Sequence, residues 1–150
     1  MEFLIEECEK IDLKTKCGFD ELSLYTEPFC TNCSIVIEKT HLTLDFDLYT
    51  KRILGLSGFV GELTKLSKTK IGNFTIVSDV KLFVDSSEKF VEGIGYELGS
   101  CGRLLYDDSC NAMRIVFEKR VSDSNQYYRV LDGVLVQLDQ NELQEIVVLL

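Results

Sequence analysis

Paired carboxylates and paired thiols are the residues of this chain whose types and spacing could support chemistry. Asp45 and Asp47 are separated by Phe46 in an alternating segment, so in a strand both carboxylates project to the same side, beside Thr43. Such a pair can bind a hard cation or share a proton. It can equally be plain solvated surface or an acidic stripe that faces a partner, and we predict no metal site there.

Six cysteines raise the question of a disulfide or a zinc site: Cys8, Cys17, Cys30, Cys33, Cys101 and Cys110. The sequence shows no export signal, so disulfides are not expected. Cys30 and Cys33 form a Cys-x-x-Cys pair, which could bind zinc or act as a redox pair. A structural zinc site needs two further ligands, and neither a second such pair nor a second histidine near His41 supplies them. We interpret the thiols as buried groups without a special role, keep the zinc and redox alternatives open, and predict no cofactor.

His41 is the only histidine of the chain. Histidine is the commonest general base because its unperturbed pKa lies near neutrality. The Gly-x-Ser-x-Gly and His-Glu-x-x-His motifs are absent, and Gly55, Gly58 and Gly61 are spaced differently from the dinucleotide fingerprint. The sequence therefore predicts a protein that is not an enzyme and has no catalytic residues.

The chain is strongly acidic. Its 25 acidic and 16 basic side chains give a net charge of −9 and an isoelectric point of about 4.6. Binders of nucleic acid normally carry a clustered basic face, so we do not expect nucleic acid as a direct partner. Residues 1–50 hold 11 acidic and 4 basic side chains, which makes the acidity mostly N-terminal. This charge can serve solubility alone, or it can attract a basic protein partner.

Length and hydropathy predict one domain over residues 1–150, without membrane contact. The longest apolar run, residues 146–150, is far too short to cross a bilayer. The N-terminus starts with an acidic residue and a short apolar run, unlike a secretory signal. Internal repeats and linkers are not visible. We therefore expect a cytoplasmic protein.

Alternation of apolar and polar residues predicts strands through the middle of the chain. The expected strands cover residues 42–48, 74–84, 90–98, 113–117, 127–131 and 134–138. Asp107 to Ser109 and the pair Asp132 and Gly133 mark tight turns, which favour antiparallel pairing.

Helical patterns are confined to the two ends. Asp139 to Glu142 resembles an N-cap with an acid three residues later. The apolar residues that follow have helical spacing: Leu143, Ile146, Val147 and Leu150. Leu4, Cys8 and Ile11 allow a short N-terminal helix. The predicted fold is a β-dominated α+β domain: an antiparallel sheet or partly open barrel with a C-terminal helix and room for a short N-terminal one.

Acidic side chains and one tyrosine are the candidate partner-binding residues. Glu38, Asp45 and Asp47 are expected on strand faces. Asp107 and Asp108 are expected at the tip of a turn, where they could meet a cationic cleft. Tyr127 and Tyr128 are consecutive, so one should point outward, and tyrosine is enriched at interfaces. The predicted set is Glu38, Asp45, Asp47, Asp107, Asp108 and Tyr128.

In size, acidity and β content the chain resembles bacterial toxin-immunity proteins of the contact-dependent growth-inhibition type. The resemblance matches no family motif, so it assigns no residue. It implies a cytosolic, non-enzymatic protein that binds and neutralises a basic toxin domain, such as a nuclease, which the acidic faces would steer into place. Two other classes stay open: a small-molecule-binding or enzymatic β-barrel, and an accessory subunit of a larger assembly. The oligomeric state is left open.

Overall fold

Strands make up nearly all of the regular structure of this protein. The computed structural model describes residues 1–11, 16–27, 32–118, 120 and 124–150. One short 3₁₀ turn, Leu63–Lys65, is the helical element of this described part. The strands are β1 (Glu2–Glu7), β2 (Lys16–Asp20), β3 (Ser23–Glu27), β4 (Cys33–Glu38), β5 (His41–Phe46), β6 (Ile53–Phe59), β7 (Ser67–Lys68), β8 (Thr75–Asp85), β9 (Gly95–Asp107), β10 (Ala112–Phe117), β11 (Gln126–Leu131), β12 (Val134–Asp139) and β13 (Glu142–Leu149).

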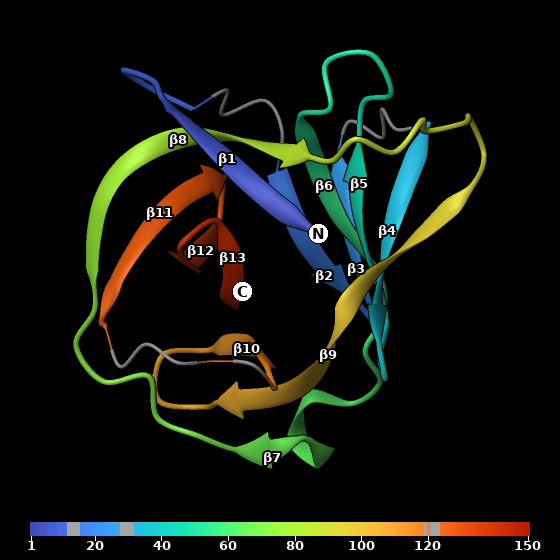
Figure 1. The fold of residues 1–150 in the computed structure, drawn as a ribbon. Helices are drawn as coiled ribbons and strands as arrows, with labels where there is room; N and C mark the ends of the chain where they lie inside the picture. Colours follow the sequence, from blue (N-terminus) through green and yellow to red (C-terminus); the bar gives the residue numbers. More distant parts are fainter. Residues whose placement is uncertain (12–15, 28–31, 119, 121–123) are drawn as a thin grey trace.

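All of these strands belong to one mixed sheet. Its order is β1-β8-β11-β12-β13-β10-β9-β4-β5-β6-β3-β2, and β7 pairs with β9 beside this path. The sheet curls so that the half containing β11, β12 and β13 faces the half containing β4, β5 and β6 (Figure 1). The pairs β4–β9, β7–β9 and β8–β11 are parallel, which corrects the expectation of a purely antiparallel sheet.

Two long strands join the two halves. The first part of β9 pairs with β4, up to Cys101, and the second part pairs with β10 from Gly102 onward. Gly102 fits at this corner because it has no side chain: a Cβ there would lie 2.7 Å from Cγ2 of Ile37. On the opposite side, β8 pairs with β11 and then passes close to β6, where the amide of Val84 donates to the carbonyl of Lys51 at 2.9 Å.

The core lies between the two halves of the sheet, and β1 contributes to it through a single residue. Phe3 is completely buried among apolar side chains from both halves, whereas its neighbour Leu4 is 44% exposed. The amide of Phe3 donates to the carbonyl of Asn141, in the turn between β12 and β13, at 2.8 Å. The strand β1 is therefore held on one side by β8 and at its start by this turn.

The predicted C-terminal helix is wrong, because residues 142–149 form the strand β13. Gln140 and Asn141 have φ angles of 47° and 67°, as in the two-residue turns that join antiparallel strands. The strand is central, and residues 143–148 are all buried. A strand covered on both faces is a continuous apolar run, and any such run also contains the spacing of a helical stripe.

The predicted N-terminal helix is also wrong, because residues 2–7 form β1. The expected strand at 90–98 is wrong in its start, since β9 begins at Gly95 and Ile94 is exposed. The expected strands at 42–48, 74–84, 113–117, 127–131 and 134–138 are confirmed, to within a few residues at their ends. The hairpin turn at Asp132 and Gly133 is confirmed as well.

The outer face of β10 and β13 carries a buried ion cluster. Glu145 is completely buried, and both of its oxygens accept from the guanidinium of Arg114, with Oε2 at 2.9 Å from Nη2. Arg120 lies 3.0 Å from the same Oε2. The hydrogen bonds that Arg114 donates to Glu145 raise the pKa of Arg114. Ile71 and Phe74 pack beside this cluster against Ala112, Tyr127, Leu135 and Val147, and so they cover this face of the sheet.

Replacing Phe3 with alanine should lower the free energy of unfolding by about 3–5 kcal/mol, because it leaves a cavity in the core. Chemical denaturation measures this loss. Leu4→Ala is the matched control on the same strand, and it should change stability by less than about 0.5 kcal/mol. Equal losses in the two variants would contradict the burial of Phe3.

Glu145→Gln should lower the free energy of unfolding by about 3–5 kcal/mol, because it leaves two arginine side chains without their carboxylate. The control is Glu118→Gln, which removes an exposed ion pair with Lys39 at 2.7 Å and should cost less than about 1 kcal/mol. A glutamine variant as stable as the wild type would show that the charge of Glu145 is not needed.

Candidate functional site

Asp45 is buried, which corrects the expectation that it shares an exposed strand face with Asp47. Its side chain is 4% exposed and lies within a ring of three hydroxyl groups. Ser34 of β4 and Thr43 of β5 donate to Oδ1 at 2.9 and 3.0 Å, and Ser57 of β6 donates to Oδ2 at 2.5 Å. Asp45 therefore connects three neighbouring strands and offers little to a partner.

Asp47 organises the turn between β5 and β6. Its Oδ1 accepts from the amide of Thr50 at 2.7 Å, from the hydroxyl of Thr50 at 2.8 Å and from the amide of Tyr49 at 3.2 Å. The bonds from Thr50 hold the pKa of Asp47 below its usual value. Tyr49, which the sequence did not single out, is 84% exposed at this turn. Tyr128, which it did, is half-buried and packs against the core.

Asp107 and Asp108 are neighbours with opposite environments. Asp107 is 1% exposed; its Oδ2 accepts from the amide of Ile71 at 2.7 Å and its Oδ1 accepts from Ser109. The hydroxyl of Ser109 and the amide of Ile71 lower the pKa of Asp107 to about 2. Asp108 is exposed and pairs with Lys68 of β7 at 3.1 Å. The turn tip thus offers one carboxylate to solvent, and a lysine already neutralises it.

Glu38 lies at the end of β4, where β9 turns the corner. Its Oε1 accepts from the amide of Gly99 at 3.1 Å, and the thiol of Cys101 donates to its Oε2 at 3.6 Å. The six residues predicted to bind a partner are therefore spread over several regions, and most of them have a structural contact of their own. Their role in binding stays a prediction, but they do not form one common surface.

The thiols show no arrangement that would hold a metal within the described part of the chain. Cys8, Cys101 and Cys110 are free thiols, and the thiol of Cys33 donates to the carbonyl of Val91 at 3.4 Å. No three acidic, cysteine or histidine side chains come together in the described part to hold a metal ion. Cys30 lies outside the described residues, so the Cys-x-x-Cys hypothesis is untested. Burial raises the pKa of the Cys33 thiol, and the carboxylates of Glu92 and Asp47 add to this effect.

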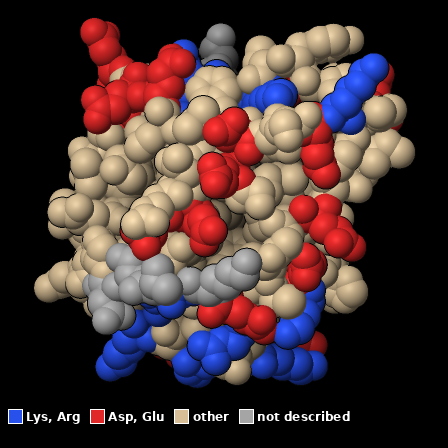
Figure 2. All heavy atoms as spheres, viewed as in Figure 1, with Lys and Arg blue, Asp and Glu red and all other residues tan. Residues whose placement is uncertain are grey.

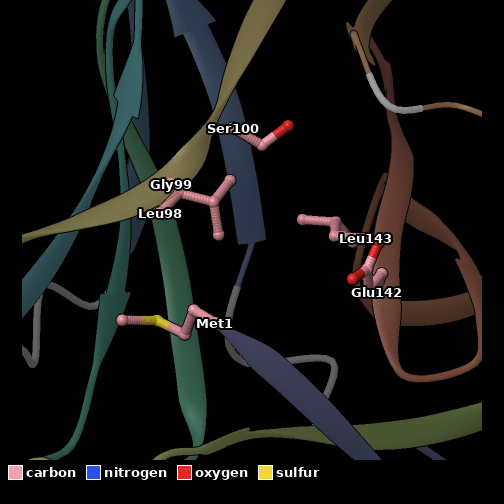
Figure 3. A pocket seen from close by; sticks show the side chains of 6 residues that line it. All are labelled: Met1, Leu98, Gly99, Ser100, Glu142 and Leu143. Atoms are coloured by element: carbon pink, nitrogen blue, oxygen red, sulfur yellow. The ribbon is translucent and has the colours of Figure 1, made fainter.

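A small cavity opens between the two halves of the sheet, next to β1. Figure 3 shows its lining, which comes from β1, β9 and β13 and consists of Met1, Leu98, Gly99, Ser100, Glu142 and Leu143. Its volume is about 40 Å³, space for about three water molecules at most, whereas ligand pockets usually have several hundred Å³. The described core therefore gives little support to an enclosed small-molecule site.

A wider hollow of about 450 Å³ lies on the outer face of β4 and β5. It is an open groove bordered by Ser34, Val36, Thr43 and the segment from Glu92 to Gly95. The hydroxyls of Ser34 and Thr43 already donate to Asp45. Glu92 and Asn32 are the other polar side chains of the lining, and the oxygen of the Asn32 side chain accepts from the amide of Leu48 at 2.8 Å.

Acidic side chains gather on the antiparallel pair formed by β1 and the second half of β8, which we call the β1–β8 ribbon (residues 2–7 and 80–85). Its exposed carboxylates are Glu2, Glu6, Glu7 and Asp85. Glu6 pairs with Lys81 at 3.3 Å, but Glu2 lies directly opposite Asp85 in the strand register. Like charges directly opposite each other are unfavourable in a sheet.

The charge is also unequally distributed over the molecule. Acidic side chains gather at the corner where β1 ends, and lysine and arginine side chains gather at the opposite end, around β7 (Figure 2). Near β7 the exposed basic residues include Lys65, Lys68 and Lys70. The two ends of the molecule would therefore attract partners of opposite charge.

Sequence reasoning missed the β1–β8 ribbon because it treated the N-terminal segment as a possible helix. The concentration of acidic residues in the first 50 positions was the one signal that pointed to this region. What the sequence did not show is that β8, about 75 residues later, pairs with β1 and adds Asp85 to the same surface.

Comparisons with known proteins assign no relative. The chain matches no protein-family model and no curated protein. Among the described residues no helix has the length and apolar character needed to cross a membrane. The function must therefore be argued from the site alone.

Asp107→Asn should remove stability at neutral pH, because an amide cannot accept all the hydrogen bonds that this carboxylate accepts. A folded-state pKa of about 2, below the ordinary 3.8, means that the carboxylate stabilises the fold above about pH 4 and loses this contribution as the pH falls toward 2. The difference between wild type and variant should therefore shrink over that window. Denaturation at several pH values measures it.

Asp108→Asn is the control for this pH dependence, since the carboxylate of Asp108 is exposed and makes one lysine contact. It should have a small effect at every pH. A difference between wild type and Asp107→Asn that stays constant down to about pH 2 would contradict the assignment.

Proposed function

We propose that this protein is a non-enzymatic binding protein that captures a basic protein partner through the β1–β8 ribbon. The observation that carries the proposal is the register of Glu2 against Asp85, two exposed carboxylates that make no ion pair with the residues the structure describes. The nearest lysine contact is that of Lys51, whose ammonium donates to the carbonyl of Ser86 at 2.9 Å. The fold gains nothing from this juxtaposition. A lysine or arginine side chain placed between the two carboxylates would remove the repulsion and add two attractive contacts.

The surroundings of these carboxylates support a protein as the partner. Leu4 and Ile5 are 44% and 37% exposed on opposite faces of β1, and Leu4 lies on the same face as Glu2 and Glu6, directly beside the charge. Protein interfaces combine such an apolar centre with a polar rim. The exposed Tyr49 lies in the turn whose Lys51, two residues later, accepts from the amide of Val84 at the end of the ribbon.

A toxin-immunity protein that neutralises a basic nuclease domain is the particular function we propose within this class. Inhibition of this kind needs no catalytic group on the inhibitor, only a surface that covers the basic site of the enzyme. The basic end around β7 would orient the complex, since it repels a cationic partner while the ribbon attracts it.

Reversing two charges of the ribbon should abolish capture of the partner without harming the fold. In the double variant Glu2→Lys with Glu7→Lys, the new lysine at position 2 faces Asp85, so stability should stay the same or rise slightly. Affinity should fall by about 10- to 100-fold, since the ribbon would then repel a cationic surface. The measurement is capture from native lysate at low and high salt, followed by mass spectrometry and titration of the captured protein.

The matched control is Glu62→Lys with Asp108→Lys, which changes the net charge equally at the opposite end of the molecule. Both residues are exposed and pair with lysines, so the fold should tolerate the change. A basic protein held by wild type and control, but lost from the ribbon variant and in high salt, is the expected result. If the ribbon variant and the control lose the same proteins, the ribbon is not the binding surface.

The immunity function has a separate readout. A captured basic partner should have nuclease activity, and stoichiometric addition of this protein should suppress that activity. A partner whose activity is unchanged in the complex would leave the binding function standing and contradict the inhibitory one.

A further inference from the structure

We infer that the partner contributes an extended basic segment that adds to the free edge of β1 as a further strand of the sheet. This inference rests on the proposed function and specifies how the ribbon would bind its partner.

The backbone of β1 has hydrogen-bonding groups that the fold leaves unused. In an antiparallel pair, successive residues point their amide and carbonyl groups alternately toward and away from the neighbouring strand. Cys8 donates to the carbonyl of Asp79 at 3.1 Å, whereas Phe3 donates away from β8, to Asn141. With the register Phe3–Val84 to Glu7–Val80, these two bonds place the amide and carbonyl of Ile5 and Glu7 on the outer edge.

Neither Ile5 nor Glu7 has a hydrogen-bond partner on that edge among the residues that the structure describes. At the start of β1 the outward amide of Phe3 is already used, because it donates to the carbonyl of Asn141. The open part of the edge therefore runs from Ile5 toward Cys8. A short strand could therefore make about four backbone hydrogen bonds, two to each of Ile5 and Glu7. Recognition by strand addition obtains its affinity from such bonds and its specificity from the flanking side chains.

The side chains beside this edge select a cationic strand. Glu2 and Glu6 project from one face of the ribbon and Glu7 from the other, with the exposed Leu4 and Ile5 between them. A strand laid along the edge would have carboxylates on both of its faces. The complementary segment alternates β-branched residues with lysine or arginine, which gives both cross-strand ion pairs and apolar contacts.

A second copy of this chain is a poor occupant of the same edge. An antiparallel pair of β1 strands that uses the outward groups of both residues must place Ile5 opposite Glu7 of the other copy. In that register the two Glu6 side chains lie directly opposite each other, which is unfavourable. Charged residues on edge strands commonly prevent self-association in this way.

The test uses the purified full chain and a synthetic eight-residue peptide of alternating valine and lysine. Amide hydrogen exchange, read residue by residue by NMR, should slow by about tenfold or more at Ile5 and Glu7 when the peptide binds. Exchange at Leu4 and Glu6, whose amides already point toward β8, should change little. The same peptide with every backbone nitrogen methylated keeps its charges but has no amide donors, and it should bind at least about tenfold more weakly.

A variant of the protein provides an independent check. Ile5→Pro removes the outward amide while leaving the bonds to β8 intact, and proline is tolerated on edge strands. It should weaken peptide binding by about tenfold, whereas Ile5→Val should leave it unchanged. If the proline variant does not fold, the methylated peptide still decides.

Failure of this inference differs from failure of the proposed function. Equal binding of the methylated peptide, or binding without protection of Ile5 and Glu7, would overturn strand addition while the capture experiment still supports an acidic binding protein. Absence of peptide binding would overturn strand addition as well, and the lysate capture then decides the function alone. Protection of Ile5 and Glu7 in the free protein, together with a dimer in sedimentation, would assign the edge to a second copy.

Discussion

A β-sheet must pair or protect the backbone of every strand, and this protein satisfies that requirement by curling one sheet around its core. The strands β8 and β9 each pair along different parts of their length with different neighbours, so they join the two halves of the sheet. The path then ends at β1 and β2, the two N-terminal strands. The strand β1 pairs with β8 along one edge, so the backbone groups on its other edge are left without a neighbouring strand. The open edge of β1 is therefore a consequence of its place at the end of the sheet.

The sequence predicted strands where alternating residue types or a strong turn pair marked them, and it failed at β13, where neither signal was present. Residues 113–117 and the hairpin around Asp132 and Gly133 show clear alternation or a strong turn pair, and both form as expected. The strand β13 is covered on one side by the core and on the other by Ile71 and Phe74, which lie about 75 residues earlier in the chain. A single sequence does not show this cover, so a continuous apolar run there was interpreted as a helix. Glu145, the charge in that run, is accommodated by arginines from β10 and the segment after it.

The expected exposure of Asp45 and Asp107 was wrong for a related reason. A carboxylate that points away from the core is exposed only if the neighbouring strands leave it uncovered. Asp45 points outward, as its place in the alternation predicts, but Ser34 and Ser57 come from the strands on both sides and donate to it. Asp107 forms a local turn contact that its type predicts, and it also accepts from Ile71, which no local pattern indicates. Charge in the sequence was thus a guide to the acidic end of the molecule, but not to the individual carboxylates that face solvent.

Two demands on an edge strand can be met by the same side chains. Negative charge along β1 protects its open backbone from a second copy of the chain, because identical edges bring glutamates together. The same charge lowers the free energy of a complex with a cationic strand and so selects among partners that all offer the same backbone groups. Glu2 and Asp85 distinguish protection against self-association from attraction of a cationic strand. Protection of the edge alone does not require two carboxylates in direct register, since the carboxylates of Glu6 and Glu7 already supply the repulsion. The repulsion between these two exposed carboxylates is small in water, and the ammonium of Lys51 already lies beside Asp85, where it donates to the carbonyl of Ser86 at 2.9 Å. A further cation placed between the two carboxylates would remove the remaining repulsion, and this is the structural basis on which we propose a basic partner for the edge.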